Sequence, residues 1–573
     1  MGCTTIIVGK NASANGATIM ARTDDSGHGS FSAKKFEVIP PNDSPSTYRS
    51  VLSHVEVPLP AGGLRYTRFP DVDGKKGLWA GAGINSALVS MTATETLTTN
   101  ERVLAADPLV ELQEAVSKPG DPDYKPEIPG GIGEEDMVVL VLPYIHCARE
   151  GVTRLGELLE TYGTYEMNGI GFADRDEVWW LETVGGHHWL ARRLPDDCYA
   201  VIANQFSLDY FDFEDAFGEA REYMCSADLR EFVAENHLDL GLYELSRERD
   251  PEPIPVELEG NPVLGFSVSN SFNPSQTPES AVINPRLAFG SRTDSDHTYN
   301  TPRVWALQRF FNPGADWDGP EAYLRPDSDD LPWCREPERK ITMEDVKYAE
   351  SYHYQGLPFD PYARPEQAMT GGADKRGIYR PIGINRTNFD AFLELRPGVP
   401  EAACGLNWIA FGAMPFNTAV PFYANVRAVP EYLGGTTPRV TTESHYWENR
   451  IIAALVDAHF HQAIAHVERY QQATVAKALA VVAKTDRAVW ELLTAGSAGS
   501  ANSPDSGDST KASATSEAEN VVALVENPKV QALLEAANEE IAAMLKRETD
   551  DLLDKVLFEA SLNMHCAFSR DDA

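Results

Sequence analysis

The stretch that decides the fold is MGCTTIIVGKNASANGATIMARTDD, residues 1–25. It contains two runs rich in β-branched residues, and the polar segment between them ends in Asn-Gly. This pattern is typical of a β-hairpin. Folding the chain back about the middle of the polar segment sets Cys3 opposite Asp24. Arg22 and Asp25 then flank the thiol, so the predicted hairpin carries a candidate reactive group.

Cys3 is a candidate nucleophile because it lies almost at the start of the chain. A thiol attacks as its thiolate, so it needs a base within reach or a cation that lowers its pKa. A cysteine that is the first residue carries its own base, since an α-amine titrates at a pKa of roughly 7.7 to 8.0. Arg22 would hold the thiolate and Asp25 would orient the amine. The alternative from these residues alone is a small buried cysteine followed by a solvated loop.

These residues also carry a family resemblance. Cys-Thr-Thr-Ile from Cys3, followed by Arg22-x-x-Asp25, resembles the N-terminal nucleophile hydrolases of the C69 dipeptidase family, relatives of penicillin V acylases and conjugated bile acid hydrolases. The resemblance covers most of residues 3–480. Further motifs that carry it include Gly83-Ile84-Asn85, Thr94-Glu95, Leu142-Pro143-Tyr144-Ile145, Asn168-Gly169-Ile170-Gly171-Phe172, Gly186-His187-His188-Trp189, Ala203-Asn204-Gln205 and Tyr299-Asn300-Thr301-Pro302-Arg303. It implies that Cys3 is the catalytic nucleophile.

The fold that the resemblance implies is α+β, with a four-layer αββα core and additional C-terminal helices. The residue patterns divide the chain into a core over 3–440, a helical segment over 441–495, a disordered Ser/Ala/Gly-rich linker over 496–517 and a C-terminal helical segment over 518–573. Within the core, residues 101–118 have a helical pattern apart from Pro108. Residues 168–206 have a period of two and predict an antiparallel meander, with Tyr199 to Ala203 as its last strand.

Asn204 is the candidate oxyanion donor. Its side-chain NH₂ follows a predicted strand, and one well-placed donor is worth roughly 3 to 4 kcal/mol to the tetrahedral intermediate of amide hydrolysis. Asn204 also matches the asparagine that has this role in the bile acid hydrolase branch. The alternative is a turn residue that ends a strand.

Thr94, Glu95 and Arg303 are candidate substrate-binding residues. Glu95 stands where the bile acid hydrolase branch has a second oxyanion asparagine, and a carboxylate cannot donate a hydrogen bond unless it is protonated. We therefore expect Glu95 to bind the free α-ammonium of a substrate. Arg303 matches the region of the relatives' last active-site arginine, and its alternative is an exposed cation at the start of a helix.

The two residues before Cys3 create a requirement. Removal of Met1 alone would leave Gly2 attached, and the catalytic amine would stay in an amide. Gly2 must therefore also be lost, by self-cleavage or through another peptidase. Thr4 and Thr5 would need further trimming to become N-terminal nucleophiles, so Cys3 is favoured over both.

Composition excludes several classes of function. Hydrophobic residues make up 43% and charged residues 24%, as in ordinary globular proteins, and 86 Asp and Glu against 49 Lys and Arg give a net charge of -37. Such a surface repels phosphate backbones and anionic lipids, so we expect no nucleic-acid or membrane partner. The seven cysteines show no CxxC spacing, which favours a reducing compartment. With no secretory signal or membrane span recognised in the sequence, we expect a cytoplasmic protein.

No metal or cofactor is expected. Asp457, His459, His461 and His466 lie close together in a predicted helix, but the zincin pattern is absent and a polar helix face explains them better. The glycines show neither GxGxxG nor P-loop spacing, so no nucleotide cofactor is implied.

The sequence thus predicts a dipeptidase that hydrolyses dipeptides with a free N-terminus through a thioester at Cys3. The resemblance implies broad specificity, no cofactor and a homo-oligomer. One alternative is an amidase of non-peptide amides such as penicillin V or a bile salt. The other is a catalytically inactive homologue retained for binding, against which the presence of Cys3, Arg22, Asp25 and Asn204 argues.

Overall fold

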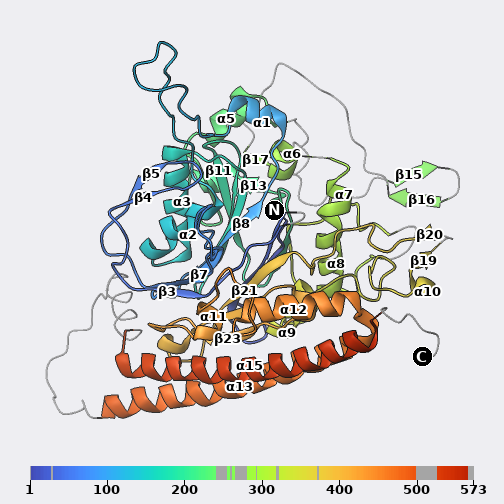
Figure 1. Cartoon of the computed structure of the whole chain (residues 1–573). Helices are drawn as coiled ribbons and strands as arrows, with labels where there is room; N and C mark the ends of the chain where they lie inside the picture. Colours follow the sequence, from blue (N-terminus) through green and yellow to red (C-terminus); the bar gives the residue numbers. More distant parts are fainter. Residues whose placement is uncertain are drawn as a thin grey trace.

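Two large antiparallel sheets form the centre of the molecule (Figure 1). The computed structural model describes residues 2–27, 30–239, 255–258, 261–264, 281–291, 293–317, 322–370, 373–498 and 526–564. The predicted linker over 496–517 lies outside these ranges apart from its first three residues.

The first sheet contains the N-terminal hairpin. Its strand order is β18-β12-β1-β2-β21-β22-β23. The bounds are β1 Thr5–Val8, β2 Thr18–Asp25, β12 Tyr199–Ile202, β18 Cys334–Arg335, β21 Thr387–Leu395, β22 Gly405–Phe411 and β23 Val420–Tyr423. β1 and β2 are buried along their whole length, which suits their β-branched composition.

The second sheet has the order β14-β11-β10-β9-β8-β7. The bounds are β7 Ala82–Ile84, β8 Ser90–Thr96, β9 Asn168–Ala173, β10 Val178–Thr183, β11 Trp189–Leu194 and β14 Tyr223–Cys225. Its strands β9 to β11 are the predicted meander, and their successive pairings are antiparallel.

The two sheets face each other. The Thr5 hydroxyl on β1 donates to Glu95 Oε1 on β8 at 2.6 Å, so side chains cross directly from one sheet to the other. At Gly171 on β9, an added Cβ would lie 3.0 Å from the sulfur of Met20 on β2, so the backbone and this side chain are close-packed. The space between the sheets therefore holds the inward-facing side chains of β1, β2 and β8.

Helices cover both outer faces. On the second sheet lie α2 (Glu134–Val141) and α3 (Ala148–Tyr162), and an added Cβ at Gly151 of α3 would overlap the Phe172 ring on β9. The first sheet is covered by α8 (Thr301–Phe311), α9 (Met343–Glu350), α12 (His445–Ala458), α13 (Phe460–Ala498) and α15 (Pro528–Leu562). The layer order is therefore αββα, and the α+β class is confirmed.

The long helices α13 and α15 run side by side along the bottom of the view (Figure 1). Lys477 and Lys484 on α13 pair with Glu548 and Glu540 on α15, so the two helices are antiparallel. Asn538 of α15 accepts a hydrogen bond from the backbone of Tyr423 on β23 at 2.8 Å. These helices therefore attach to the edge of the first sheet rather than to its centre.

Shorter elements complete the described chain. They are β3 Glu37–Ile39, β4 Thr47–Arg49, β5 Glu56–Pro58, β6 Tyr66–Arg68, α1 Glu101–Ala106, η1 Leu142–Tyr144, β13 Phe211–Asp212, α4 Phe213–Ala216, α5 Leu229–Glu235, β15 Pro255–Leu258, β16 Asn261–Leu264, β17 Val282–Ile283, α6 Pro285–Phe289, α7 Asp296–Tyr299, α10 Pro365–Ala368, β19 Met369–Thr370, β20 Ala373–Asp374, η3 Glu401–Ala403, η4 Met414–Phe416 and α11 Glu431–Gly434. Of the described helices, none is long and apolar enough to cross a membrane.

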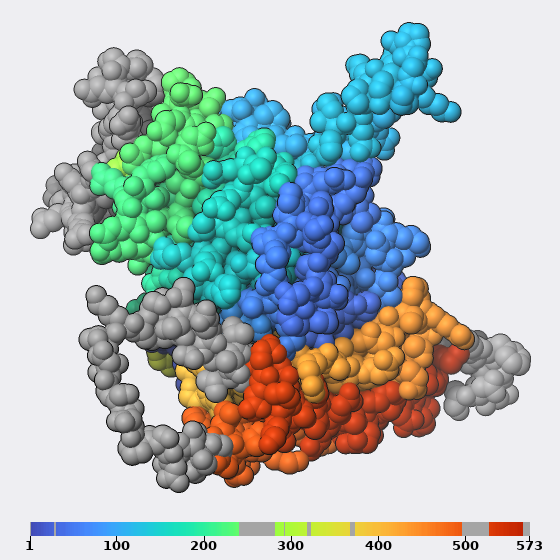
Figure 2. Space-filling model, turned by 90° about the vertical axis from the view of Figure 1, so that its left-hand side faces the viewer, coloured from blue at the N-terminus to red at the C-terminus, as the bar shows by residue number. Residues whose placement is uncertain are grey.

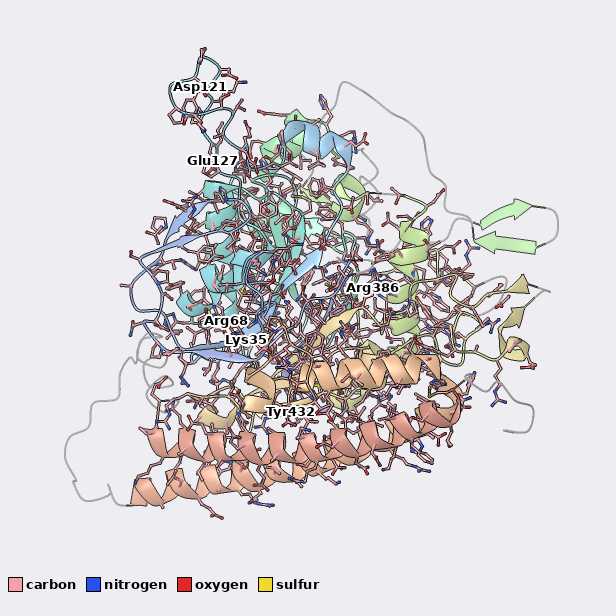
Figure 3. All side chains as sticks on the ribbon, viewed as in Figure 1. Lys35, Arg68, Asp121, Glu127, Arg386 and Tyr432 are labelled. Carbon is pink, nitrogen blue, oxygen red and sulfur yellow. The ribbon has the colours of Figure 1, made fainter. Side chains whose placement is uncertain are left out.

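The predicted helix over 101–118 is wrong beyond its first turns. α1 ends at Ala106, because Pro108 disfavours helical backbone at the residue before it. Residues 109–131 instead form an extended arm that folds back on itself, with the isolated bridges Gln113↔Ile128 and Val116↔Lys125. The arm projects from the body in Figure 2, and Figure 3 labels Asp121 near its tip.

The predicted four-strand meander is also wrong at its last member. β12 leaves the second sheet and pairs with β1, with Thr5 opposite Ile202. The turn at residues 195–198 carries the chain across the sandwich. This crossing brings Asn204, just after β12, to the open end of the N-terminal hairpin.

Candidate active site

The N-terminal hairpin positions Cys3 as predicted. β1 pairs with β2 in a register that sets Thr5 opposite Arg22. The ladder continues toward the chain start, since Thr23 N donates to Thr4 O at 3.0 Å. Cys3 therefore lies opposite Asp24, and the hairpin prediction is confirmed.

Arg22 is the immediate neighbour of the thiol. Its Nη2 lies 3.4 Å from Cys3 Sγ, 2.7 Å from Glu134 Oε1 and 2.8 Å from the carbonyl oxygen of Thr94. The guanidinium is fully buried, and Glu134 at the start of α2 balances its charge. The cation is thus held against the sulfur by contacts with the opposite sheet and its helix.

The Cys3 thiol is fully buried in this form of the protein, in which Gly2 is still attached. Cys3 has 0% exposure, and burial raises the pKa of its thiol while Arg22 opposes that shift. Asp24, across the ladder, is neutralised by an ion pair of 2.9 Å with Lys34. In this form the Cys3 side chain is fully enclosed by protein groups.

Arg303 lies beneath the first strand. It is fully buried on α8, so the alternative of an exposed helix-start cation is wrong. Its Nη1 donates to the carbonyl of Cys3 and, at 2.8 Å, to the Thr4 hydroxyl. Its Nη2 donates to Asn204 Oδ1 at 2.8 Å and to Asn300 Oδ1 at 2.7 Å. Arg303 therefore connects the residue that carries the thiol to Asn204.

Asn204 is held at both ends of its side chain. Arg303 binds the amide oxygen, which leaves the NH₂ group directed at Glu95, whose Oε2 lies 3.3 Å from Asn204 Nδ2. The backbone carbonyl of Asn204 accepts from Asn300 Nδ2 at 3.1 Å. Because Arg303 occupies the amide oxygen, the orientation of the amide is fixed and its NH₂ group is the donor toward Glu95.

Glu95 is almost completely buried between the sheets, at 1% exposure. Burial raises its pKa to about 8, although the Thr5 hydroxyl and the charges of Arg22 and Arg303 act in the opposite direction. At neutral pH its carboxyl group is therefore mostly protonated while the site is closed. A cation that entered the site would favour its ionised form.

Thr94 takes part mainly through its backbone. Its carbonyl accepts from Arg22 Nε at 3.1 Å, and its hydroxyl donates to Asn168 Oδ1 at 2.7 Å. In this form of the chain, Thr94 thus orients Arg22 and its hydroxyl is already engaged.

The side chain of Asp25 contacts Arg380 and Thr387 and not the Cys3 thiol. The register of β2 with β21 shifts between Asp24 and Asp25, so the strand is irregular at this point. The Asp25 carboxylate binds Arg380 and accepts from the Thr387 hydroxyl at 2.6 Å. Gly2 N donates to the backbone carbonyl of Asp25 at 3.4 Å. Asp25 therefore lies beside the backbone that precedes Cys3, where a new α-amine would form.

Four buried charged residues at the site escaped the sequence analysis. They are Glu134, Glu350, Arg380 and Asp390. The run Glu134-Glu135-Asp136 forms the first turn of the apolar helix α2, and three acidic residues at the start of a buried helix were a usable signal for Glu134. No local pattern distinguishes the other three.

Glu350 and Asp390 are unusual because neither carboxyl oxygen of either side chain has a hydrogen-bond partner in the described chain. Both residues are fully buried, Glu350 at the end of α9 and Asp390 on β21 opposite Thr23. Burial raises both pKa values well above the ordinary 4.5 and 3.8.

Neighbouring charges modify these two pKa values. For Glu350, the carboxylates of Glu95 and Asp25 add to the rise, and Arg303 and Arg380 oppose it.

For Asp390, Glu350, Asp25 and Asp24 add to the rise and Arg22 opposes it. The net direction is upward for both groups, so each is protonated well above the pH at which it would ionise in the unfolded chain.

This arrangement predicts a pH-dependent gain in stability from neutral substitutions. A raised folded pKa stabilises the fold below the unfolded pKa, and this contribution is lost as pH rises through the folded pKa. Glu350→Gln and Asp390→Asn each replace a carboxyl group that titrates with a neutral amide. We therefore expect the Tm of each variant minus the Tm of the unmodified chain to increase as the pH rises above about 4.5. At pH 8 this difference should exceed its value at pH 4 by about 2 °C or more. Thermal unfolding at pH 4, 6 and 8 measures this.

The matched control is Asp330→Asn at an exposed position, for which the Tm difference should not grow with pH. A Tm difference for Glu350→Gln that is the same at pH 4 and pH 8 contradicts the assignment of a raised pKa.

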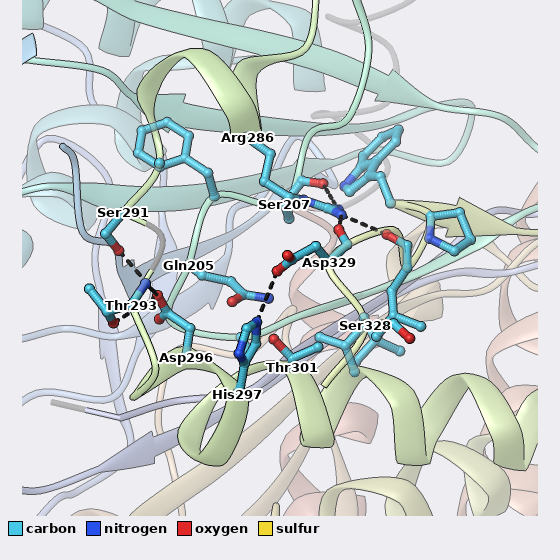
Figure 4. Close-up of a pocket in the computed structure, with 18 of the residues that line it drawn as sticks. Gln205, Ser207, Arg286, Ser291, Thr293, Asp296, His297, Thr301, Ser328 and Asp329 are labelled. Atoms are coloured by element: carbon cyan, nitrogen blue, oxygen red, sulfur yellow. Dashed lines mark hydrogen bonds and ion pairs between the residues drawn. The ribbon is translucent and has the colours of Figure 1, made fainter. Parts of the chain in front are cut away.

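A separate cavity of about 210 Å³ lies beside Asn204 and is lined by the flanking residues Ala203 and Gln205. Figure 4 shows His297 directed at Asp329, with 2.9 Å between Nε2 and Oδ1. The guanidinium of Arg286 donates hydrogen bonds to the backbone carbonyls of Ser207 and Leu331. Cys3 is not among the lining residues, and the cavity is therefore distinct from the thiol's surroundings.

A sandwich of two antiparallel sheets between helical layers, with a cysteine two residues before the first strand and almost at the chain start, is the architecture of an N-terminal nucleophile hydrolase. Arg22 and Asp25 come from β2 and Asn204 from the end of β12, and Arg303 joins Asn204 to the backbone of Cys3.

Comparison with known proteins agrees with this class. A sequence model of peptidase family C69 matches residues 2–473. The chain therefore belongs to peptidase family C69 and is a peptide-bond hydrolase.

Two relatives match this chain over the full length of both sequences. A dipeptidase from Bifidobacterium longum is 48% identical over 586 residues, and a probable dipeptidase A from Streptococcus pyogenes serotype M3 is 42% identical over 572 residues; both alignments cover 100% of each chain. Among solved structures, a variant of conjugated bile acid hydrolase from Clostridium perfringens is 8% identical, with coverage of 74% of this chain and 97% of that one. Its TM-score of 0.28 is too low to support an argument about fold or function.

Proposed function

We propose that the protein is a dipeptidase that uses the thiol of Cys3 to hydrolyse dipeptides with a free N-terminus. The observation that carries the proposal is the distance of 3.4 Å between Cys3 Sγ and the buried guanidinium of Arg22, on the first hairpin of a family C69 chain. The names of the relatives, dipeptidase and probable dipeptidase A, support the substrate class.

The proposed reaction begins once Cys3 is the first residue. Its α-amine, with a pKa near 7.7 to 8.0, takes the thiol proton, and Sγ adds to the scissile carbonyl. Asn204 Nδ2 donates to the oxygen that becomes negative. The C–N bond breaks, the leaving amine takes the proton, and a thioester remains. Water, deprotonated by the α-amine, then hydrolyses the thioester and frees the thiol.

In this proposal, three charged residues orient or stabilise the reacting groups without forming bonds to the substrate. They are Arg22, Asp25 and Arg303. Arg22 stabilises the thiolate, and Asp25 lies where it can orient the new amine. Arg303 keeps the oxygen of the Asn204 amide occupied, which turns the NH₂ group toward the reaction. Its substrate-binding role, and that of Thr94, stay predictions, because both side chains are engaged with protein groups in this form.

Glu95 is proposed to bind the α-ammonium of the substrate. Its carboxyl group is buried beside Asn204, and Thr5 is the other hydrogen-bond donor to it. An entering ammonium would ionise Glu95 and form a charge-assisted pair in a buried site, which is a strong interaction. This would select dipeptides over N-blocked substrates.

Glu95→Gln tests this selectivity. A hydrogen bond to a charged group contributes about 1.5 to 3 kcal/mol, so we expect KM for free dipeptides to rise about 10- to 100-fold. Steady-state kinetics on a free dipeptide and its N-acetyl derivative measure the change, and the preference for the free form should fall by a similar factor. An unchanged KM for free dipeptides would refute the role.

The matched control is Glu135→Gln. Glu135 is also a buried carboxyl group, but it bonds to Ser50 and Tyr165 instead of the residues around Cys3. We expect its substitution to leave the preference for free dipeptides unchanged.

A substrate panel tests the proposed function as a whole. Dipeptides with free N-termini are assayed beside penicillin V and a conjugated bile salt, and we expect hydrolysis of the dipeptides. Hydrolysis of the non-peptide amides without hydrolysis of any dipeptide would overturn the proposal.

We also propose a cytoplasmic homo-oligomer. The six cysteines in the described chain are all free, which supports a reducing compartment. Val116 and Ile128 on the projecting arm are 48% and 52% exposed, so the arm carries apolar side chains that a second subunit could cover. Light scattering of the purified chain measures the subunit number.

The division into a hydrolase core over 3–440 and helical segments over 441–495 and 518–573 belongs to the same proposal. It is supported by α13 and α15, which pack on β23 and on each other, away from the residues around Cys3.

A further inference from the structure

A lysine that the proposed mechanism does not use is buried beside the site. Lys34 follows β2 in the chain and has 2% exposure. Three oxygen atoms surround its ammonium nitrogen, at 2.9 Å for Asp24 Oδ2, 2.8 Å for Asp71 Oδ1 and 2.8 Å for the carbonyl oxygen of Trp79. Burial lowers the pKa of Lys34, but the two carboxylates outweigh burial and raise it. The side chain is therefore a cation at neutral pH.

One partner of Lys34 lies next to the nucleophile. Asp24 has 4% exposure and is opposite Cys3 in the hairpin, where the Cβ atoms of paired residues are about 4.5 to 5.5 Å apart. Burial raises the pKa of Asp24, but the charges of Lys34 and Arg22 lower it further, so its carboxyl group is ionised at neutral pH. A negative charge at this position raises the pKa of the Cys3 thiol. Without a cation beside it, Asp24 would oppose formation of the thiolate.

The other acidic groups around the thiol are paired or protonated. Glu134 pairs with Arg22 at 2.7 Å, and Asp25 pairs with Arg380. Burial raises the pKa of Glu95 to about 8, so this group is mostly protonated at neutral pH. The charged and titratable groups that act on the thiol or bind its backbone are Arg22 and Asp24 on β2, Glu95 on β8, Glu134 on α2, Arg303 on α8, the pair of Asp25 with Arg380 and, acting on these in turn, Glu350 on α9 and Asp390 on β21.

The position of the Lys34 ammonium is fixed by segments that are distant in the chain. Lys34 forms a backbone bridge with Asp71, and its Nζ donates to the carbonyl of Trp79. Nζ also lies 5.3 Å from the ring centre of Phe389, the residue opposite Asp24 in the pairing of β2 with β21. The cation is therefore held beside Asp24 by contacts outside the N-terminal hairpin.

We propose that Lys34 is a positioning residue for the nucleophile, which it serves by neutralising the Asp24 carboxylate opposite Cys3. With this charge balanced, Arg22 stabilises the thiolate without opposition from Asp24. Lys34 acts through Asp24 rather than through the reacting atoms. The inference rests on the proposed function in that it takes Cys3 as the nucleophile.

Lys34→Met tests the proposal, because it removes the cation and keeps an unbranched side chain. Arg22 and the amide of Asn388 continue to favour the ionised form of Asp24, so the negative charge stays beside the thiol. We expect the pKa of the Cys3 thiol to rise by about one unit or more, and kcat/KM for a dipeptide at pH 7 to fall about tenfold. An unchanged thiol pKa in folded Lys34→Met would overturn the proposal.

The thiol pKa is measured through alkylation of Cys3 by iodoacetamide between about pH 5 and pH 10, with the N-terminal peptide quantified by mass spectrometry. The enzyme used is a chain whose first residue is shown by intact mass to be Cys3. Alkylation needs the thiolate but no turnover of a dipeptide. The pH profile of kcat/KM for a free dipeptide is recorded in parallel, and its acid limb should move upward by the same amount.

A double variant separates the effect of charge from the effect of packing. Lys34→Met combined with Asp24→Asn lacks both charges, and we expect its thiol pKa to return to within about half a unit of the unmodified value. A purely structural role for Lys34 predicts no recovery, because the packing defect remains. No recovery in the folded double variant therefore contradicts the proposal.

Asp24→Asn alone decides the question if Lys34→Met does not fold. This variant keeps the lysine and removes the negative charge, so we expect its thiol pKa to fall below the unmodified value. An unchanged or raised thiol pKa in Asp24→Asn counts against the role of Lys34, since Asp24 would then have no effect for the lysine to balance.

Lys347→Met is the matched control. Lys347 is also buried, at 6% exposure, and its ammonium pairs with Glu344 on α9 at 3.2 Å. We expect its substitution to leave the thiol pKa and kcat/KM unchanged. A thiol pKa shift as large as that of Lys34→Met would show a general effect of losing a buried cation, and the specific role of Lys34 would be rejected.

The two measurements separate this inference from the proposed function. If Lys34→Met shifts the pKa of Cys3 in alkylation but the unmodified chain hydrolyses no dipeptide, the proposed function fails and the effect of Lys34 on the thiol stands. If the unmodified chain hydrolyses dipeptides and Lys34→Met has the unmodified thiol pKa, only the role of Lys34 fails.

Discussion

Cys3→Ala is expected to lower kcat/KM for dipeptides at least about a thousandfold, because the variant lacks the atom that forms the thioester. Cys3→Ser should lose a comparable factor, since a hydroxyl is much less ionised than a thiol beside the same amine. Steady-state hydrolysis of a free dipeptide measures both. The fold should persist, because alanine removes only one buried sulfur atom.

Cys147→Ala is the matched control. Cys147 is half-buried at the start of α3, outside the residues around Cys3, and its replacement should leave kcat/KM unchanged. A Cys3→Ala chain that keeps a tenth of the activity or more would show that Cys3 is not the nucleophile.

Asn204→Ala has the second largest expected effect. The loss of one preorganised oxyanion donor lowers kcat about 100- to 1000-fold, because the interaction is stronger in the transition state than with bound substrate. KM for dipeptides should change little. The measurement is kcat and KM for a free dipeptide, with Tm recorded to exclude unfolding.

Gln205→Ala is the control for this prediction, because its side chain lines the separate cavity beside Asn204. We expect it to keep kcat within a factor of about two. If Asn204→Ala raised KM and left kcat unchanged, Asn204 would stabilise the bound substrate and the transition state equally. It would then not be the oxyanion donor.

The hairpin was predictable because its geometry is local. Alternation along two strands and a turn ending in Asn-Gly set the register, and a one-residue slip would move every side chain to the other face. Cys3 and Arg22 are only 19 residues apart, and their contact follows from that register.

The rest of the site depends on contacts between distant parts of the chain. Glu134 is 112 residues from Arg22, and Arg303 is 300 residues from Cys3. The resemblance indicated Asn204 and Arg303 by motif. The crossing of β12 to the first sheet, which brings Asn204 to Cys3, was mistaken for continuation of a meander, because a short strand has the same period in either sheet.

The sequence by itself determined the hairpin, the αββα class through its motifs, and the identity of the candidate nucleophile. These depend on side-chain periodicity, turn chemistry and residue order, which are written locally along the chain. Only the tertiary structure decided that Lys34 pairs with Asp24 opposite Cys3, and that Glu350 and Asp390 lie buried without hydrogen-bond partners in the described chain. Such contacts depend on how sheets and helices that are far apart in the sequence pack against each other. A local sequence pattern does not predict that packing.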